Sequence, residues 1–137
     1  MGTSTTPDFT DTGLLPGTSY AYKVQAFDTS DNPSLFSDVL TTATTKDVTP
    51  PTKPGNIKAS SITQTTMTLS WGASTDNVGV VKYYIYKNGV KIGESTTLSI
   101  PVTGLVKNTS YTFTVAALDV SGNMSVLSNP LTVKTAN

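Results

Sequence analysis

The sequence of 137 residues contains no cysteine, no histidine and no arginine, and each absence excludes a class of chemistry. Without cysteine the chain forms no disulfide, and without cysteine or histidine a zinc site would have to be built from carboxylates alone. Ser-His-Asp and Cys-His nucleophilic catalysis are excluded for the same reason. Nine lysines balance nine acidic residues. A chain without a basic stripe or bidentate arginine is not expected to bind nucleic acid.

Good helix formers are also scarce, because alanine and glutamate are few, while threonine and serine are abundant. This composition favours strands and turns over helices. No apolar run is long enough to span a membrane, so no membrane partner is expected. The N-terminal segment, residues 1–7, has no positive region followed by an apolar region, and it therefore does not have the pattern of a signal peptide.

The most informative feature that is present is an internal repeat. The segment 12–20 (TGLLPGTSY) matches the segment 103–111 (TGLVKNTSY) at an offset of 91 residues. The offset holds without a gap from residues 2–45 to residues 93–136, with 20 identities over 44 positions. Chance would give only about four or five identities in a chain this rich in Thr and Ser, so the segments are copies of one structural unit.

The two copies differ in length, which predicts the domain organisation. The second copy has residues 55–92 in front of its matching part, whereas the first copy has nothing in front of it. We therefore expect residues 1–46 to be the C-terminal half of a repeat, residues 47–54 to be a proline-rich linker, and residues 55–137 to be a complete domain. On this interpretation the chain is a piece of a longer polypeptide, and the missing signal peptide says nothing about localisation.

The complete copy shows the pattern of an all-β domain. Residues 67–71 and 111–117 alternate apolar and polar side chains, as half-buried strands do. Asn88-Gly89 predicts a tight hairpin turn between two strands. Seven short strands are expected, at residues 57–59, 67–71, 81–86, 90–92, 98–102, 111–117 and 131–134. Their inward face is expected to hold Ile57, Met67, Leu69, Trp71, Tyr83, Ile85, Ile100, Leu105, Tyr111, Phe113, Val115, Ala117, Leu131 and Val133.

These residues resemble those of the fibronectin type III domain, an immunoglobulin-like β-sandwich of seven strands. Trp71 stands at the family's strand-B tryptophan, and Leu105 and Tyr111 stand at its tyrosine corner. The resemblance implies that the first copy holds strands E, F and G without strands A to C′. It assigns a structural role in the core or the corner to Trp71, Tyr83, Ile85, Leu105, Tyr111, Val115, Leu14, Tyr20 and Val24.

The loops make the resemblance more specific. Residues 74–80 and 118–125 are similar to loops of the fibronectin modules found in secreted bacterial chitinases and cellulases. The resemblance implies a non-catalytic accessory or spacer module, outside the cell or at its surface, whose partners are neighbouring domains of the same polypeptide. The alternative is a module that binds carbohydrate, such as insoluble chitin or cellulose, or a cell surface. No catalytic residue and no cofactor are predicted.

Two aspartates in these loops are a candidate site. Asp76 and Asp119 resemble the carboxylate pair of a glycoside hydrolase, and together with Asn77 they resemble part of a calcium site. Loop aspartates, however, usually make turns by accepting hydrogen bonds from the local backbone. The three residues also supply fewer ligands than a dedicated calcium loop. We therefore interpret them as turn residues and predict no metal site.

Exposed aromatic residues are the other candidate site. If Tyr83 and Val115 point inward, then Tyr84, Tyr86 and Leu118 point outward, and Phe27 takes the place of Leu118 in the first copy. Such side chains could stack on sugar rings, although aromatic residues also occur on strands simply as cross-strand pairs.

The first copy raises a further expectation. Its apolar faces lack their usual partners, so residues 1–46 should be poorly packed or completed by another chain or by the intact domain.

Overall fold

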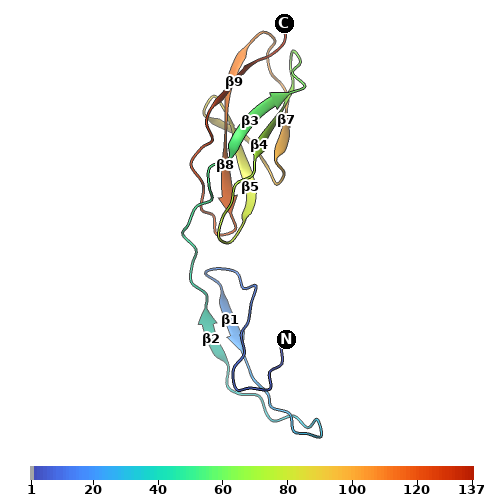
Figure 1. Ribbon diagram of the computed structural model, residues 1–137, viewed down its shortest axis with the longest axis vertical. Coiled ribbons are helices and arrows are strands. Elements are labelled where there is room, and N and C mark those ends of the chain that lie inside the picture. Colours follow the sequence, from blue (N-terminus) through green and yellow to red (C-terminus); the bar gives the residue numbers. More distant parts are fainter. Residues whose placement is uncertain (1) are drawn as a thin grey trace. The chain divides into compact units, whose positions relative to one another are not determined.

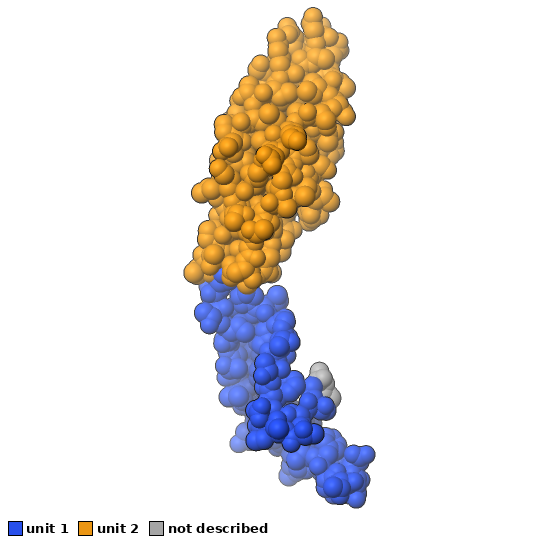
Figure 2. All heavy atoms as spheres, in the orientation of Figure 1, with its two compact units in different colours: residues 1–47 blue, residues 48–137 orange. Residues whose placement is uncertain are grey.

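The computed structural model describes residues 2–137 as two compact units. Unit 1 ends at Asp47, and unit 2 comprises Val48–Asn137 (Figure 2). The described residues form nine strands and no helix, which confirms the all-β fold class (Figure 1). No described segment is a helix of the length and apolar character that crossing a membrane requires.

Unit 2 is a sandwich of two antiparallel sheets. One sheet has the order β3-β4-β7, from strands Gly55–Ser60, Met67–Gly72 and Ser99–Val102. The other has the order β6-β5-β8-β9, from strands Val90–Ser95, Val80–Lys87, Ser110–Asp119 and Leu131–Lys134. These seven strands lie at the positions that the alternating sequence pattern predicts, with ends that differ by up to three residues. Because the strands alternate, each sheet has one apolar face for the core.

The core of unit 2 lies between these apolar faces. Strand β4 contributes Met67, Leu69 and Trp71, and β5 contributes Tyr83 and Ile85. The rings of Trp71 and Tyr83 are 5.5 Å apart and tilted, which is a favourable aromatic arrangement. The remaining buried core residues are Val102, Leu105, Phe113, Val115 and Ala117.

The hairpin between β5 and β6 turns at Asn88-Gly89. Both residues have positive φ, 49° for Asn88 and 80° for Gly89, as the backbone of a type I′ turn requires. Asn88 also bonds the neighbouring strand, because its Oδ1 accepts from the N–H of Thr112 at 2.9 Å. The turn is therefore tied to β8 as well as to its own hairpin.

The proline-rich segment after Asp47 packs onto unit 2. Pro54 is fully buried, and Pro51 is buried as well. The N–H of Thr52 donates to the carbonyl of Thr75 at 2.9 Å, and the N–H of Thr75 donates to Thr52 Oγ1 at 2.8 Å. Most of the segment that the sequence suggests as a linker is thus part of the compact second unit.

Both units contain the same tyrosine corner. The N–H of Val106 donates to the hydroxyl of Tyr111 at 2.9 Å in unit 2. In unit 1 the N–H of Leu15 donates to the hydroxyl of Tyr20 at 2.8 Å. Each hydroxyl fixes the loop that precedes its own strand, so the repeat is present in hydrogen bonding as well as in sequence.

Unit 1 contains two strands rather than the three that the resemblance implies. Strands β1 (Ser19–Tyr22) and β2 (Leu40–Ala43) pair with each other, but residues 8–11 form no strand. The equivalent residues of unit 2, 99–102, form β7 only by pairing with β4. Within the described part of unit 1 no counterpart of β4 exists, so the expected strand E has no ladder to join.

Candidate functional site

The outward face of β5 and β8 carries three of the four residues considered for sugar stacking. In the register of the two strands, Tyr84 pairs with Ala116, Tyr86 with Thr114, and Lys82 with Leu118. Tyr84, Tyr86 and Leu118 are all half-buried. The alternation that buries Tyr83 and Ile85 therefore brings these three together on one sheet surface, which we call the outer face.

Tyr84 lies under two lysines. The ammonium nitrogen of Lys91 is 3.3 Å from the centre of the Tyr84 ring, and that of Lys82 is 5.4 Å away. Both lysines also pair with Glu94, at 3.3 Å for Lys82 and 3.4 Å for Lys91. Hydrogen bonds from Lys82 and Lys91 lower the pKa of the Glu94 carboxyl. A sugar that stacked on this side of Tyr84 would first have to displace Lys91.

Tyr86 and Leu118 meet a third apolar side chain on the outer face. The hydroxyl of Tyr86 is 3.8 Å from the sulfur of Met124, and Leu118 forms a backbone bridge with Met124. Phe27 occupies the equivalent position in unit 1, where it forms the same kind of bridge with Pro33. Phe27 is 62% exposed. The outer face is therefore a small mixed surface of aromatic, apolar and charged groups.

The two loop aspartates act as hydrogen-bond acceptors. Oδ1 of Asp76 accepts from the N–H groups of Val78 and Gly79, both at 3.0 Å. The carboxylate of Asp119 accepts from Asn123 twice, from its N–H at 2.8 Å and from its side-chain amide at 2.7 Å. These are the local turn bonds that the sequence predicts for loop aspartates. Asp119 is nevertheless only 2% exposed, which the sequence pattern does not indicate.

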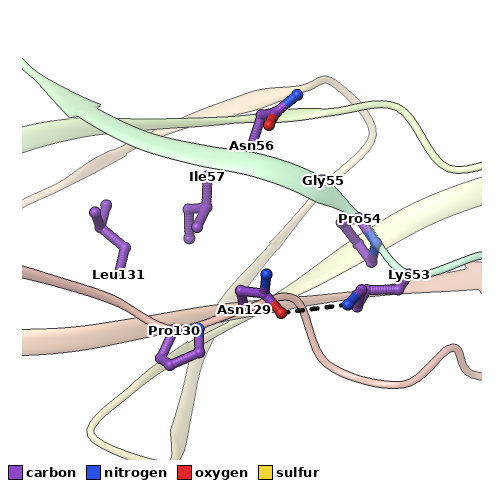
Figure 3. A pocket seen from close by; sticks show the side chains of 8 residues that line it. All are labelled: Lys53, Pro54, Gly55, Asn56, Ile57, Asn129, Pro130 and Leu131. Atoms are coloured by element: carbon purple, nitrogen blue, oxygen red, sulfur yellow. Dashed lines mark hydrogen bonds between the residues drawn. The ribbon is translucent and has the colours of Figure 1, made fainter.

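A shallow groove lies at the edge of the sandwich, where β3 begins and the chain approaches β9. Figure 3 shows its lining, in which Lys53 donates from Nζ to Oδ1 of Asn129 at 3.2 Å. Ile57 and Leu131 contribute its apolar part. Its volume of about 210 Å³ lies below the range of about 300–1,000 Å³ that is usual for small-molecule sites. The groove therefore gives little support to a small-molecule site.

Two serines have a structural role that reasoning from the sequence missed. The hydroxyl of Ser128 accepts from the buried N–H of Val115 at 3.0 Å, and that of Ser125 accepts from the N–H of Ala117 at 2.9 Å. In unit 1, Ser37 accepts from Val24 in the same way at 3.0 Å. The signal that could have predicted this role is that serine occupies the same positions in both copies of the repeat, 91 residues apart.

Comparison with known proteins gives the chain's family. The family model of the fibronectin type III domain matches residues 50–134. The chain is 43% identical to "Exoglucanase B" of Cellulomonas fimi, over 98% of this chain and 13% of that protein. It is 44% identical to "Chitinase A1" of Niallia circulans, over 93% of this chain and 19% of that protein.

A solved structure gives the same result. "Chitinase ChiA74 from Bacillus thuringiensis" is 44% identical over 64% of this chain and 14% of that one, with a TM-score of 0.59. This chain thus spans less than one fifth of each of these three relatives. What matches is a fibronectin type III segment, which is a non-catalytic fold. The chain belongs to the fibronectin type III domain family.

Proposed function

We propose that this chain is a non-catalytic spacer of a secreted bacterial polysaccharide-degrading enzyme of the chitinase or cellulase type. It positions a catalytic domain relative to a carbohydrate-binding domain. Support comes from the relatives, which are named exoglucanase and chitinase and are five or more times longer than the matched segment. In such a polypeptide the chemistry belongs to other domains, and this chain sets the distance between them.

The observation that carries this proposal is the duplicated framework of hydrogen bonds inside the two units. The corner tyrosines, Tyr20 and Tyr111, and the serines that bond Val24 and Val115 are repeated at the same offset. The hydrogen bonds of each framework lie within one unit. Repeated modules of this kind are suited to setting distance.

The connection between the units is short, which suits the same role. Thr45 still belongs to the framework of unit 1, because its carbonyl accepts from the N–H of Gly17 at 3.1 Å. Unit 2 begins at Val48. Unit 1 ends at Asp47, so the two units follow each other along the chain without a Gly/Ser-rich linker between them.

The test is a fusion in which the chain joins a chitinase catalytic domain to a chitin-binding domain. The matched control replaces the chain with a Gly/Ser linker of similar contour length. We expect equal rates on a soluble chitin oligomer, because the catalytic domain is unchanged, and a higher rate on insoluble chitin for the fibronectin fusion. Equal rates on both substrates would contradict a positioning role.

A second candidate function is polysaccharide binding at the outer face. Tyr84 and Tyr86 on one sheet surface favour it, whereas the lysine over Tyr84 opposes it. Pull-down of the intact chain on chitin and on cellulose tests this function. Binding that is lost in Tyr84→Ala and Tyr86→Ala but kept in Val90→Ala, an exposed residue on β6, would support it. No retention of the intact chain would contradict it.

We also propose that the apolar face of unit 1 is completed by another polypeptide segment. Val24 is 71% exposed, while its counterpart Val115 is fully buried. Leu40 is 63% exposed. Sedimentation over a range of concentrations tests whether a second copy provides the cover. Reversible dimerisation that weakens in Val24→Ser would support completion by a second copy, and a monomer at every concentration would contradict it.

A further inference from the structure

We propose that unit 2 binds a divalent cation, with calcium as the best-suited ion, between Asp76 and Asp119. Asp76 lies on the loop between β4 and β5, and Asp119 ends β8. The pairing of Val80 with Asp119 brings the end of β8 beside the start of β5, directly after that loop. Both carboxylates therefore lie at the same end of the sandwich.

The spacing of the two carboxylates suits one ion. A carboxylate oxygen of Asp76 and one of Asp119 lie within 4.8 Å of each other. Calcium–oxygen bonds are about 2.3–2.6 Å long, so one calcium ion bridges two oxygens that are up to about 4.8 Å apart. The bonds that Asp76 Oδ1 accepts from Val78 and Gly79 hold that carboxylate in place.

Two buried oxygens without a hydrogen-bond partner, on the loop between β4 and β5, point to a ligand. Oδ2 of Asp76 is buried and accepts no hydrogen bond from any described residue. On the same loop, the buried hydroxyl of Ser74 also has no hydrogen-bond partner among the described residues, and Ser74 is only 8% exposed. A buried carboxylate oxygen without a partner is costly, and buried charges normally pair with another charge or coordinate a metal.

No lysine of the described chain pairs with either aspartate. Lys82 and Lys91, which lie on the neighbouring strands, both pair with Glu94. The partner of Asp119 is Asn123, which is neutral, and the loops 73–79 and 120–124 contain no basic residue. Two carboxylates this close repel each other, and a divalent cation removes that repulsion while it satisfies the free oxygen.

The spacing of the carboxylates favours calcium over magnesium. Magnesium–oxygen bonds are about 2.0–2.1 Å long, so one magnesium ion bridges oxygens only up to about 4.2 Å apart, whereas calcium covers separations up to the 4.8 Å limit found here. Calcium also tolerates irregular geometry, whereas magnesium requires a near-ideal octahedron. Because the protein supplies few ligands, we expect a dissociation constant of about 10⁻⁴–10⁻³ M, as in extracellular calcium modules.

The test is titration of the full chain with calcium chloride. Isothermal titration calorimetry should show saturable binding, and the thermal midpoint followed by Trp71 fluorescence should rise with calcium and rise less with magnesium. Asp76→Asn keeps the shape and the Oδ1 acceptor but removes the charge, so it should abolish both effects. Asp28→Asn is the control, because Asp28 makes in unit 1 the turn bonds that Asp119 makes in unit 2, and its replacement should leave the calcium response unchanged.

Terbium luminescence gives a second readout that does not depend on stability. Tyr83 bonds the N–H of Ser74 through its hydroxyl at 3.1 Å, two residues from Asp76, so it is placed to sensitise a bound terbium ion. We expect luminescence that calcium displaces and that Asp76→Asn lacks. Absence of saturable calcium binding, or equal terbium luminescence in wild type and Asp76→Asn, would overturn the proposal.

Discussion

Replacement of Ser128 by alanine tests the serine hydrogen bonds of the sandwich. The hydroxyl of Ser128 accepts from the N–H of Val115 at 3.0 Å, and the N–H of Ser128 donates to the carbonyl of Val115 at 2.7 Å. Ser128 is 4% exposed and Val115 is fully buried. The hydroxyl of Ser128 takes the place of the backbone carbonyl that a neighbouring strand would supply. Ser128→Ala therefore leaves the buried N–H of Val115 without a partner.

The expected cost follows from that geometry. A buried donor that loses its only partner costs about 1–3 kcal/mol. Water cannot easily replace the hydroxyl, because neither residue is exposed to solvent. If Ser128→Ala lowers the free energy of unfolding by about 2 kcal/mol, and the urea m-value is about 2 kcal/mol per molar, the unfolding midpoint of unit 2 should fall by about 1 M urea.

The assay is urea unfolding of the full chain, followed by Trp71 fluorescence. Trp71 is the single tryptophan of the chain and lies in the core of unit 2, so its signal reports this unit. Ser37→Ala is the matched control, because it removes the equivalent bond to Val24 in unit 1. We expect no midpoint shift for that variant. A shift below about 0.3 M for Ser128→Ala, or an equal shift for Ser37→Ala, would refute the reasoning.

Three further predictions concern unit 2, each measured by the same urea assay. Phe113→Ala should lower the free energy of unfolding by about 3–5 kcal/mol, because it opens a cavity at a fully buried position. Gly89→Ala should cost about 1 kcal/mol, because a β-carbon is strained at its φ of 80°. The pKa of Glu94 is lowered by Lys82 and Lys91. The pairs therefore stabilise the fold above the unfolded-state pKa of Glu94, and this contribution is lost as the pH falls through the lower folded-state pKa. Glu94→Gln should consequently lose less stability than the wild type on acidification, and equal losses would contradict the assigned pairs.

Much of the fold could be predicted from the sequence because its signals are local. The alternation in β4 and β8 gives the buried faces, and Asn88-Gly89 gives the β5–β6 turn. Both depend on residues close together in the chain, and their physical reasons are the strand period of two and the positive φ that the turn demands. The family resemblance is confirmed by the family model, which matches residues 50–134.

The candidate sites were harder to predict because they depend on contacts between distant residues. That Lys91 covers the ring of Tyr84 follows from the register of β5 and β6, which shifts between Ile85 and Tyr86. The proximity of Asp76 and Asp119 follows from the pairing of β5 with β8. Neither register can be derived from composition or periodicity, so the sequence gives the residue types at the site but not which of them meet.

The two copies separate what a segment determines by itself from what its neighbours supply. Tyr20 and Tyr111 make the same corner bond, although only Tyr111 belongs to a closed sandwich. Val24 and Val115, in contrast, occupy the same position of the repeat, and the N–H of each donates to a serine hydroxyl. Val24 is nevertheless 71% exposed, whereas Val115 is fully buried. These hydrogen bonds are therefore encoded within the C-terminal half of the repeat, whereas burial of the valine requires the preceding half, which in unit 2 supplies β3, β4 and β5. Stability of the module must come chiefly from packing against those strands, because apolar burial is the main favourable contribution to folding.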